Sequence, residues 1–156
     1  MLRKILLLLA PVVFVAHFLE EGPAFVAWFN AHVARDITEP LFWTVNVIAL
    51  VLTVSVVVIE WLMQDRVSAV LATAWLSFLM AANALFHLAG ALRDRAYMPG
   101  LVTALALYLP FYVWVVATIL RTRRLGPAAT AAAALIGALP MVVHGYLIVF
   151  RGSRLF

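Results

Sequence analysis

Residues 2–23 read LRKILLLLAPVVFVAHFLEEGP, a long apolar run that ends in one histidine and two glutamates. On a helix, residues three and four positions apart share one face, so His17, Glu20 and Glu21 would point the same way, about one turn apart. Gly22-Pro23 follows directly, and a proline disfavours helical geometry in the residue before it. The stretch therefore predicts a helix over residues 2–21 that breaks directly after Glu21 and carries groups able to close on a metal ion.

The composition is that of an integral membrane protein. Hydrophobic residues make up 67% and charged residues 12% of the 156 residues, and the mean hydropathy is +1.09, whereas soluble domains are roughly half apolar and a quarter charged. Cysteine is absent, which excludes disulfides, thiolate metal sites and iron–sulfur clusters. The net charge of +4 comes from arginines scattered at segment ends, a pattern that fits anchoring at anionic lipid headgroups. We expect membrane lipids, and no nucleic acid, as partners.

Five apolar stretches are long enough to cross a bilayer as helices of about 20 residues. These stretches are residues 2–21, 41–63, 67–92, 99–120 and 128–150. A shorter apolar stretch, residues 24–33, contains Trp28, Phe29 and His32 and is typical of a re-entrant or interfacial helix. Because lipid leaves unpaired backbone groups unsatisfied, the spans should be helices. The expected fold class is all-α: a polytopic membrane bundle of about five transmembrane helices, with the short helix after the first, forming one domain over residues 1–156.

Local sequence features add three expectations about this bundle. Pro99 should lie in the first turn of the fourth span, where a proline loses no hydrogen bond. The alanine run at residues 128–134, together with Gly137, should give a smooth face for close helix contact. The dense basic turn at residues 121–124 favours a cytoplasmic N-terminus, with the plasma membrane as the expected location.

Polar residues in three spans fall at one depth of the predicted bundle. Residues 17–21 lie near the far end of the first span, Asn83 and His87 about 16 to 20 residues into the third, and His144 about 16 residues into the fifth. These spans run in the same direction, so all three sets reach the same layer. Ionisable residues inside a membrane are costly and usually face a bundle interior. The sequence therefore predicts one shared polar site.

Imidazole and carboxylate groups together are a ligand set for zinc, with non-haem iron as the alternative. The expected metal ligands are His17, Glu20, His87 and His144. Glu21 lies against the Gly-Pro break, where the helix opens towards water, so we assign it to proton transfer, while Glu20 has the firmer helical support that a ligand needs. Asn83 is suited to a hydrogen bond that orients a ligand.

Further polar residues lie towards the ends of the spans. Arg93, Arg95 and Tyr97 are expected at the mouth of the site, where the arginines can receive an anionic headgroup or serve as ordinary interfacial anchors. His32 lies outside the spans and is expected at the surface. Glu60, beside a tryptophan at the opposite end of its span, is expected as a charge at headgroup level.

Three short motifs resemble those of one protein family. Residues 17–21 match an H-x-x-E-E motif, residues 83–87 an N-x-x-x-H motif, and His144 falls where a further C-terminal histidine is found. In these features, which extend over nearly the whole chain, the sequence resembles the HXXEE family of predicted membrane proteins. The function of that family is unknown, so the resemblance implies that these residues form one site and adds no reaction.

The residues suggest more than one class of function. The first expectation is a membrane metalloprotein, most simply a zinc-dependent hydrolase that acts on a lipid or another amphiphile. A non-haem iron oxidoreductase is the near variant, because two histidines and a carboxylate form a facial triad. The alternatives are a haem or ion-handling protein, with His87 and His144 as axial ligands of the haem, and a membrane subunit without catalytic activity.

Overall fold

The computed structural model describes residues 8–155, which are helical apart from short connections and contain no strand. The elements are α2 (Leu9–Glu21), α3 (Phe25–His32), α4 (Glu39–Met63), α5 (Arg66–Leu76), the π-helical η1 (Ser77–Ala82), α6 (Asn83–Asp94), α7 (Leu101–Thr103), the π-helical η2 (Ala104–Tyr108), α8 (Leu109–Arg121) and α9 (Pro127–Arg151). The expected start of the first span, including Arg3 and Lys4, lies outside the described residues.

Four continuous helical stretches are long and apolar enough to cross a membrane. They are Glu39–Met63, Arg66–Asp94, Leu101–Arg121 and Pro127–Arg151. The pair α2 and α3 passes the same test as one unit that bends by 68°, which makes a fifth candidate span or a re-entrant loop. The predicted all-α bundle of about five membrane helices, with a short helix after the first, is therefore confirmed.

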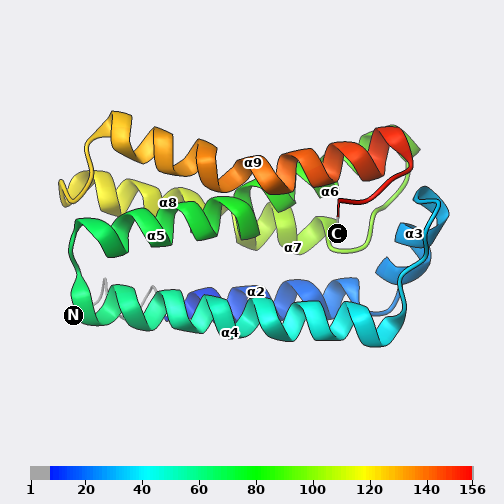
Figure 1. The fold of residues 1–156 in the computed structure, drawn as a ribbon, viewed down its shortest axis with the longest axis horizontal. Helices are drawn as coiled ribbons and strands as arrows, with labels where there is room; N and C mark the ends of the chain where they lie inside the picture. The colour runs from blue at the N-terminus through cyan, green and yellow to red at the C-terminus, as the bar shows by residue number, and fades with distance from the viewer. Residues whose placement is uncertain (1–7, 156) are drawn as a thin grey trace.

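The helices run side by side along the long axis of the molecule (Figure 1). Helix α2 packs on α4, and α5 packs on both α4 and α9. Helices α2, α6 and α9 end, and α7 begins, at the end of the bundle that carries α3, whereas α4 ends and α5 begins at the opposite end (Figure 1). The polar residues near the ends of α2 and α6 are therefore brought to one end of the bundle, as the sequence predicted.

The break after α2 forms at the predicted place. Helix α2 ends at Glu21, and the backbone N–H of Gly22 closes the last turn by donating to the Phe18 carbonyl at 2.9 Å. Pro23 has no N–H with which to continue the ladder. The chain then turns sharply into α3, so the last turn of α2 is held at the end of the bundle.

The fourth span begins later than expected. Its helix starts at Leu101, and Pro99 lies in the preceding turn rather than in the first helical turn. Gly100 precedes the helix with φ +89°, a left-handed conformation that glycine adopts without strain. Met98, Pro99 and Gly100 are all buried. Irregular backbone at membrane depth is tolerated where protein covers it, and this buried turn is such a case.

Close helix packing occurs where the small residues predicted it. Gly137 of α9 lies directly against α5, and a Cβ at this position would overlap the backbone of Ala74. Ala133, one turn earlier on α9, is also buried. Small residues let helix backbones approach each other in this way.

Glu60, in the last turn of α4, lies in a buried ion pair. Its residue is only 7% exposed, and Arg124 from the α8–α9 connection donates to both carboxylate oxygens, with Nη2 to Oε2 at 2.7 Å. The hydrogen bond to Glu60 raises the pKa of Arg124. The same guanidinium donates to the carbonyl of Asp65 at 2.7 Å, so the pair joins the end of α4 to the α8–α9 connection.

Candidate metal centre

Two imidazoles and one carboxylate meet at the end of the bundle that carries α3. His17 and Glu21 lie on the last turns of α2, and His87 comes from α6. Glu21 Oε1 is 3.1 Å from His87 Nε2 and 3.5 Å from His17 Nε2. Both histidine side chains are fully buried, and the glutamate side chain is 7% exposed. Each residue offers one ligand atom, and the three atoms lie within 4.8 Å of one another.

These separations fit a shared metal ion. Two ligand atoms at the usual zinc distances of about 2.0–2.1 Å, set at a tetrahedral angle, are about 3.3–3.4 Å apart. The distances of 3.1 and 3.5 Å lie on either side of that separation. Within residues 8–155, neither Nε2 atom has a hydrogen-bond partner of acceptable geometry. Buried polar atoms without a partner are costly, and a cation between these three atoms would satisfy all of them.

A hydrogen bond sets the orientation of His17. Its Nδ1 lies 2.8 Å from Thr103 Oγ1, and the Thr103 hydroxyl donates to the Gly100 carbonyl at 3.3 Å. Because the hydroxyl proton is donated to the Gly100 carbonyl, the hydroxyl oxygen accepts a hydrogen bond from Nδ1–H of His17. Nε2 then presents a lone pair towards the Glu21 carboxylate. Metal-binding histidines commonly have their second nitrogen fixed in this manner.

Gly100 closes one side of the site. A Cβ on this residue would lie 2.7 Å from His87 Cε1, 2.8 Å from Glu21 Cγ and 2.9 Å from His17 Cε1. All three distances are shorter than side-chain atoms tolerate, so only glycine fits against the three residues. Sequence reasoning missed this role, because a glycine after a proline indicates a turn but not what the turn touches.

Tyr108 is a further polar residue at this site that sequence reasoning missed. Its side chain is fully buried, and its ring centroid lies 4.1 Å from that of His17. Its hydroxyl has no hydrogen-bond partner in the part of the chain that the structure describes. Tyr108 ends the π-helical segment η2, and such segments are frequent at functional sites. The one feature of the sequence that could have indicated it is that Tyr108 carries a hydroxyl group inside an apolar span.

Glu21, rather than the expected Glu20, lies with the two histidines. Glu20 accepts hydrogen bonds from the Tyr97 hydroxyl and from the backbone N–H groups of Val102, at 3.1 Å, and Thr103, at 2.7 Å. Its carboxylate thus caps the start of α7 and stands outside the group of three ligand atoms. Successive helical residues point about 100° apart. Glu21 therefore faces α6 together with His17, whereas Glu20 points towards α7.

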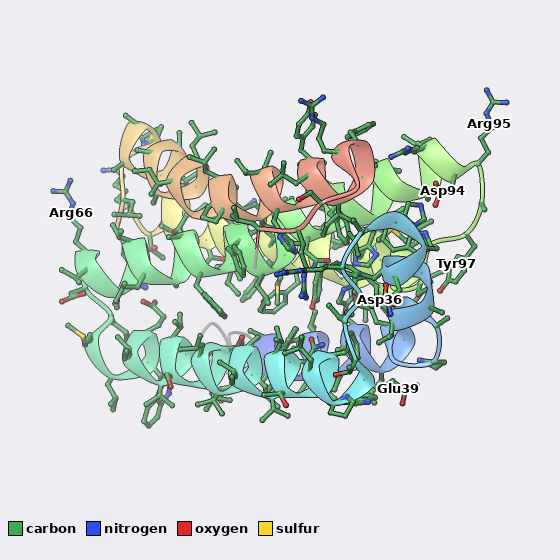
Figure 2. All side chains as sticks on the ribbon, turned by 45° about the vertical axis from the view of Figure 1, so that its right-hand side comes forward. Asp36, Glu39, Arg66, Asp94, Arg95 and Tyr97 are labelled. Carbon is green, nitrogen blue, oxygen red and sulfur yellow. The ribbon has the colours of Figure 1, made fainter. Side chains whose placement is uncertain are left out.

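Tyr97 is a hydrogen-bond partner of Glu20. Figure 2 shows it on the connection between α6 and α7, at the end of the bundle that carries α3. Burial and the hydrogen bond to Glu20 raise the pKa of Tyr97, so its hydroxyl stays protonated and keeps donating at neutral pH.

His144 and Asn83 are not brought into the group of three. His144 is buried on α9, where its Nδ1 accepts from the backbone N–H of Leu155 at 3.3 Å, so it faces the segment after α9. Asn83 Oδ1 is buried without a hydrogen-bond partner among the described residues, and no hydrogen bond joins Asn83 to His17, Glu21 or His87. Equal depth in the membrane does not determine the direction in which each helix turns its side chains.

The two arginines expected at the mouth do not form an anion-binding fork. The Arg93 guanidinium lies 5.8 Å from the centroid of the Phe150 ring. Arg95 is exposed and extends away from the bundle (Figure 2). The cause is the helix end, because Arg95 takes a left-handed conformation after α6 and its side chain leaves the helix axis there.

His32, expected at the surface, is partly buried and bonded to two neighbouring residues. Its Nε2 lies 2.9 Å from Asp94 Oδ2, its Nδ1 lies 2.7 Å from the Trp28 carbonyl, and the Trp28 indole also donates to Asp94 at 2.9 Å. The ring of His32 stacks on Trp28 with centroids 4.1 Å apart. These contacts fasten α3 to the end of α6 beside the site.

The fold and the site together define a bundle of membrane helices with a buried cluster of two histidines and one carboxylate. Residues 8–115 match the family described as a protein of unknown function with HXXEE motif. The chain belongs to this family, and the motif letters are His17, Glu20 and Glu21. Comparison with curated proteins and with solved structures gave no match.

Proposed function

We propose that this protein is a membrane metalloenzyme that binds one zinc ion with His17, Glu21 and His87. The observation that carries the proposal is the meeting of three buried donor atoms whose separations suit a tetrahedral ion, with both imidazole Nε2 atoms lacking a hydrogen-bond partner among the described residues. Two histidines and a glutamate are the protein ligands of several catalytic zinc sites, which leave a further coordination position open.

The proposed reaction is hydrolysis of an ester or amide bond in a lipid or another amphiphile. Water adds across the bond, so an ester gives an acid and an alcohol. A bound zinc ion supplies Lewis acidity for this chemistry. The protein supplies the ligands, and the position of the site inside a membrane bundle favours an amphiphilic substrate.

Tyr108 and Glu20 take different parts in this proposal. The buried Tyr108 hydroxyl, next to His17, is the neutral donor that can hydrogen-bond to an oxygen of the substrate. Glu20 is occupied by three hydrogen bonds and positions the start of α7. Glu21, which the sequence pattern assigned to proton transfer, is proposed as the third ligand.

The same donor set favours non-haem iron as the second candidate metal, since two histidines and one carboxylate form the facial triad of iron oxygenases. The haem alternative is poorly supported. His87 Nε2 faces Glu21 Oε1 at 3.1 Å, and the wall formed by Gly100 is closed even to a single Cβ.

The test is elemental analysis of the purified protein combined with an esterase assay on short-chain lipid esters. We expect about one zinc per chain, and we expect His17→Ala, His87→Ala and Glu21→Gln each to lower zinc affinity at least about tenfold. Glu20→Gln and His144→Ala, as matched controls, should keep the ion. Tyr108→Phe should keep the ion and lose turnover.

Several results would contradict this proposal. Stoichiometric iron with an absorption band in place of zinc would favour an oxidoreductase. Bound zinc without esterase activity would contradict the proposed hydrolysis and would indicate a metalloprotein with another activity. Zinc content that is unchanged in all three ligand variants would exclude this site.

A further inference from the structure

A cavity lies outside the metal centre, between the α3–α4 connection and the segment after α9. Its volume is about 550 Å³, and it is lined by Ala34, Arg35, Gly152, Ser153, Arg154 and Leu155. This is within the range of about 300–1,000 Å³ that small-molecule sites occupy. None of these residues belongs to the metal centre.

The walls of this cavity are tied to the rest of the bundle. The backbone N–H of Ala34 donates to the Gly152 carbonyl at 3.0 Å, which joins the two walls. The N–H of Ser153 donates to the Leu147 carbonyl at 3.2 Å, and the N–H of Leu155 donates to His144 Nδ1 at 3.3 Å. The segment after α9 is therefore folded back on its own helix.

The charges in this cavity are of one sign. Arg35 and Arg154 both line it, together with Ser153. Within residues 8–155, no salt bridge joins either arginine to a carboxylate, although Asp36 is the neighbour of Arg35 in sequence. Each guanidinium presents a fork of N–H donors that suits a phosphate group, and a hydroxyl can add a further hydrogen bond.

The position of the cavity indicates where such a phosphate would come from. It lies where α9 ends and where α3 leads into α4, at the same end of the bundle as the metal centre (Figure 1). In a membrane protein, this is the level of the lipid headgroups. Ala34 and Leu155 add apolar surface beside the arginines, as the glycerol and the first acyl carbons of a phospholipid require.

Other arginines of the chain are less suited to this role. Arg124 is paired with Glu60, Arg93 lies over the Phe150 ring, and Arg95 extends away from the bundle (Figure 2). We propose that the cavity lined by Arg35, Ser153 and Arg154 binds the phosphate of an anionic phospholipid headgroup at the membrane surface.

The experiment measures binding of short-chain phosphatidylglycerol to the full chain in neutral detergent, by native mass spectrometry and by the lipid-induced shift in Tm. Short-chain phosphatidylcholine and inorganic phosphate are the comparison ligands. The wild type should bind phosphatidylglycerol more tightly than either. The double variant Arg35→Gln with Arg154→Gln should bind it at least about tenfold more weakly.

The matched control removes the same charge at the opposite end of the bundle, with Arg66→Gln and Arg121→Gln, and should bind like the wild type. An equal loss of phosphatidylglycerol binding in the control would mean that the lipid is attracted by the overall positive charge of the protein, and it would overturn the proposal. Inorganic phosphate that competes as strongly as the lipid would overturn the assignment to a lipid. If the double variant does not fold, Arg35→Lys and Arg154→Lys keep the charge but lose the fork, and unchanged binding in both would contradict the proposal.

Discussion

Gly100 is the residue whose replacement tests the metal centre while all three proposed ligands are kept. We predict that Gly100→Ala lowers metal affinity at least about tenfold and reduces the free energy of unfolding by about 1–3 kcal/mol, because the new Cβ collides with three site residues at a positive φ. Isothermal titration with zinc and thermal unfolding measure the two effects. Gly126→Ala is the control, since nothing lies within 4 Å of a Cβ there. Equal behaviour of both variants would mean that the close approach of Gly100 is unimportant.

The hydroxyl group of Thr103 is the hydrogen-bond partner of the His17 ring. Thr103→Val keeps the shape of the side chain but removes the partner of His17 Nδ1. We expect zinc affinity to fall about 10- to 100-fold, the usual effect of losing a residue that orients a ligand. Thr118→Val is the matched control, because among residues 8–155 the Thr118 hydroxyl bonds only to the Trp114 carbonyl of its own helix. Zinc affinity that stays at the wild-type value in Thr103→Val would refute the orienting role.

The assignment within the motif shows what a residue pattern leaves undetermined. His17 and the two glutamates were correctly placed on neighbouring turns, but both i+3 and i+4 pairs can share a metal. The choice depends on the neighbours of α2. Here α6 brings His87 to Glu21, while backbone N–H groups of α7 donate to Glu20. Neither neighbouring helix can be predicted from residues 17–21 alone.

At the scale of helices, the pair of Glu60 and Arg124 tests how the end opposite the metal centre is held. We predict that Glu60→Gln destabilises the protein by about 1–3 kcal/mol, since it leaves part of the Arg124 guanidinium without its partner. The free energies of unfolding of Glu60→Gln, Arg124→Gln and the double variant form a double-mutant cycle. The double variant should cost less than the sum of the two single variants. Strict additivity would show that the pair contributes no coupling.

Helix boundaries could be predicted where the sequence carries turn chemistry, and were missed where tertiary contacts set them. The end of α2 follows from Gly22-Pro23, and the start of α5 follows from Asp65, whose side chain accepts from the Ser68 N–H at 2.8 Å. The start of α7 is different. Residues 98–100 form a buried turn against the site, and a proline followed by a glycine is equally typical of a helix start.

At the scale of the whole molecule, depth in the bilayer was the most informative quantity that the sequence supplied. Alternate spans run in the same direction, so counting residues from the turns is enough to place the polar residues of α2 and α6 in one layer. The same count placed His144 in that layer, although its helix turns it towards Leu155. Rotation about a helix axis depends on packing, and in a chain this apolar the hydrophobic pattern carries little information about it.

We propose that one metal ion lies between His17, Glu21 and His87. Anomalous X-ray diffraction at the zinc absorption edge, on crystals of the protein purified with its native metal, tests it directly. We expect one strong peak about 2.0–2.2 Å from His17 Nε2, His87 Nε2 and Glu21 Oε1, and no peak at His144. The proposal would be contradicted if crystals of metal-replete protein showed no anomalous peak between these three atoms, or showed their peak elsewhere in the protein.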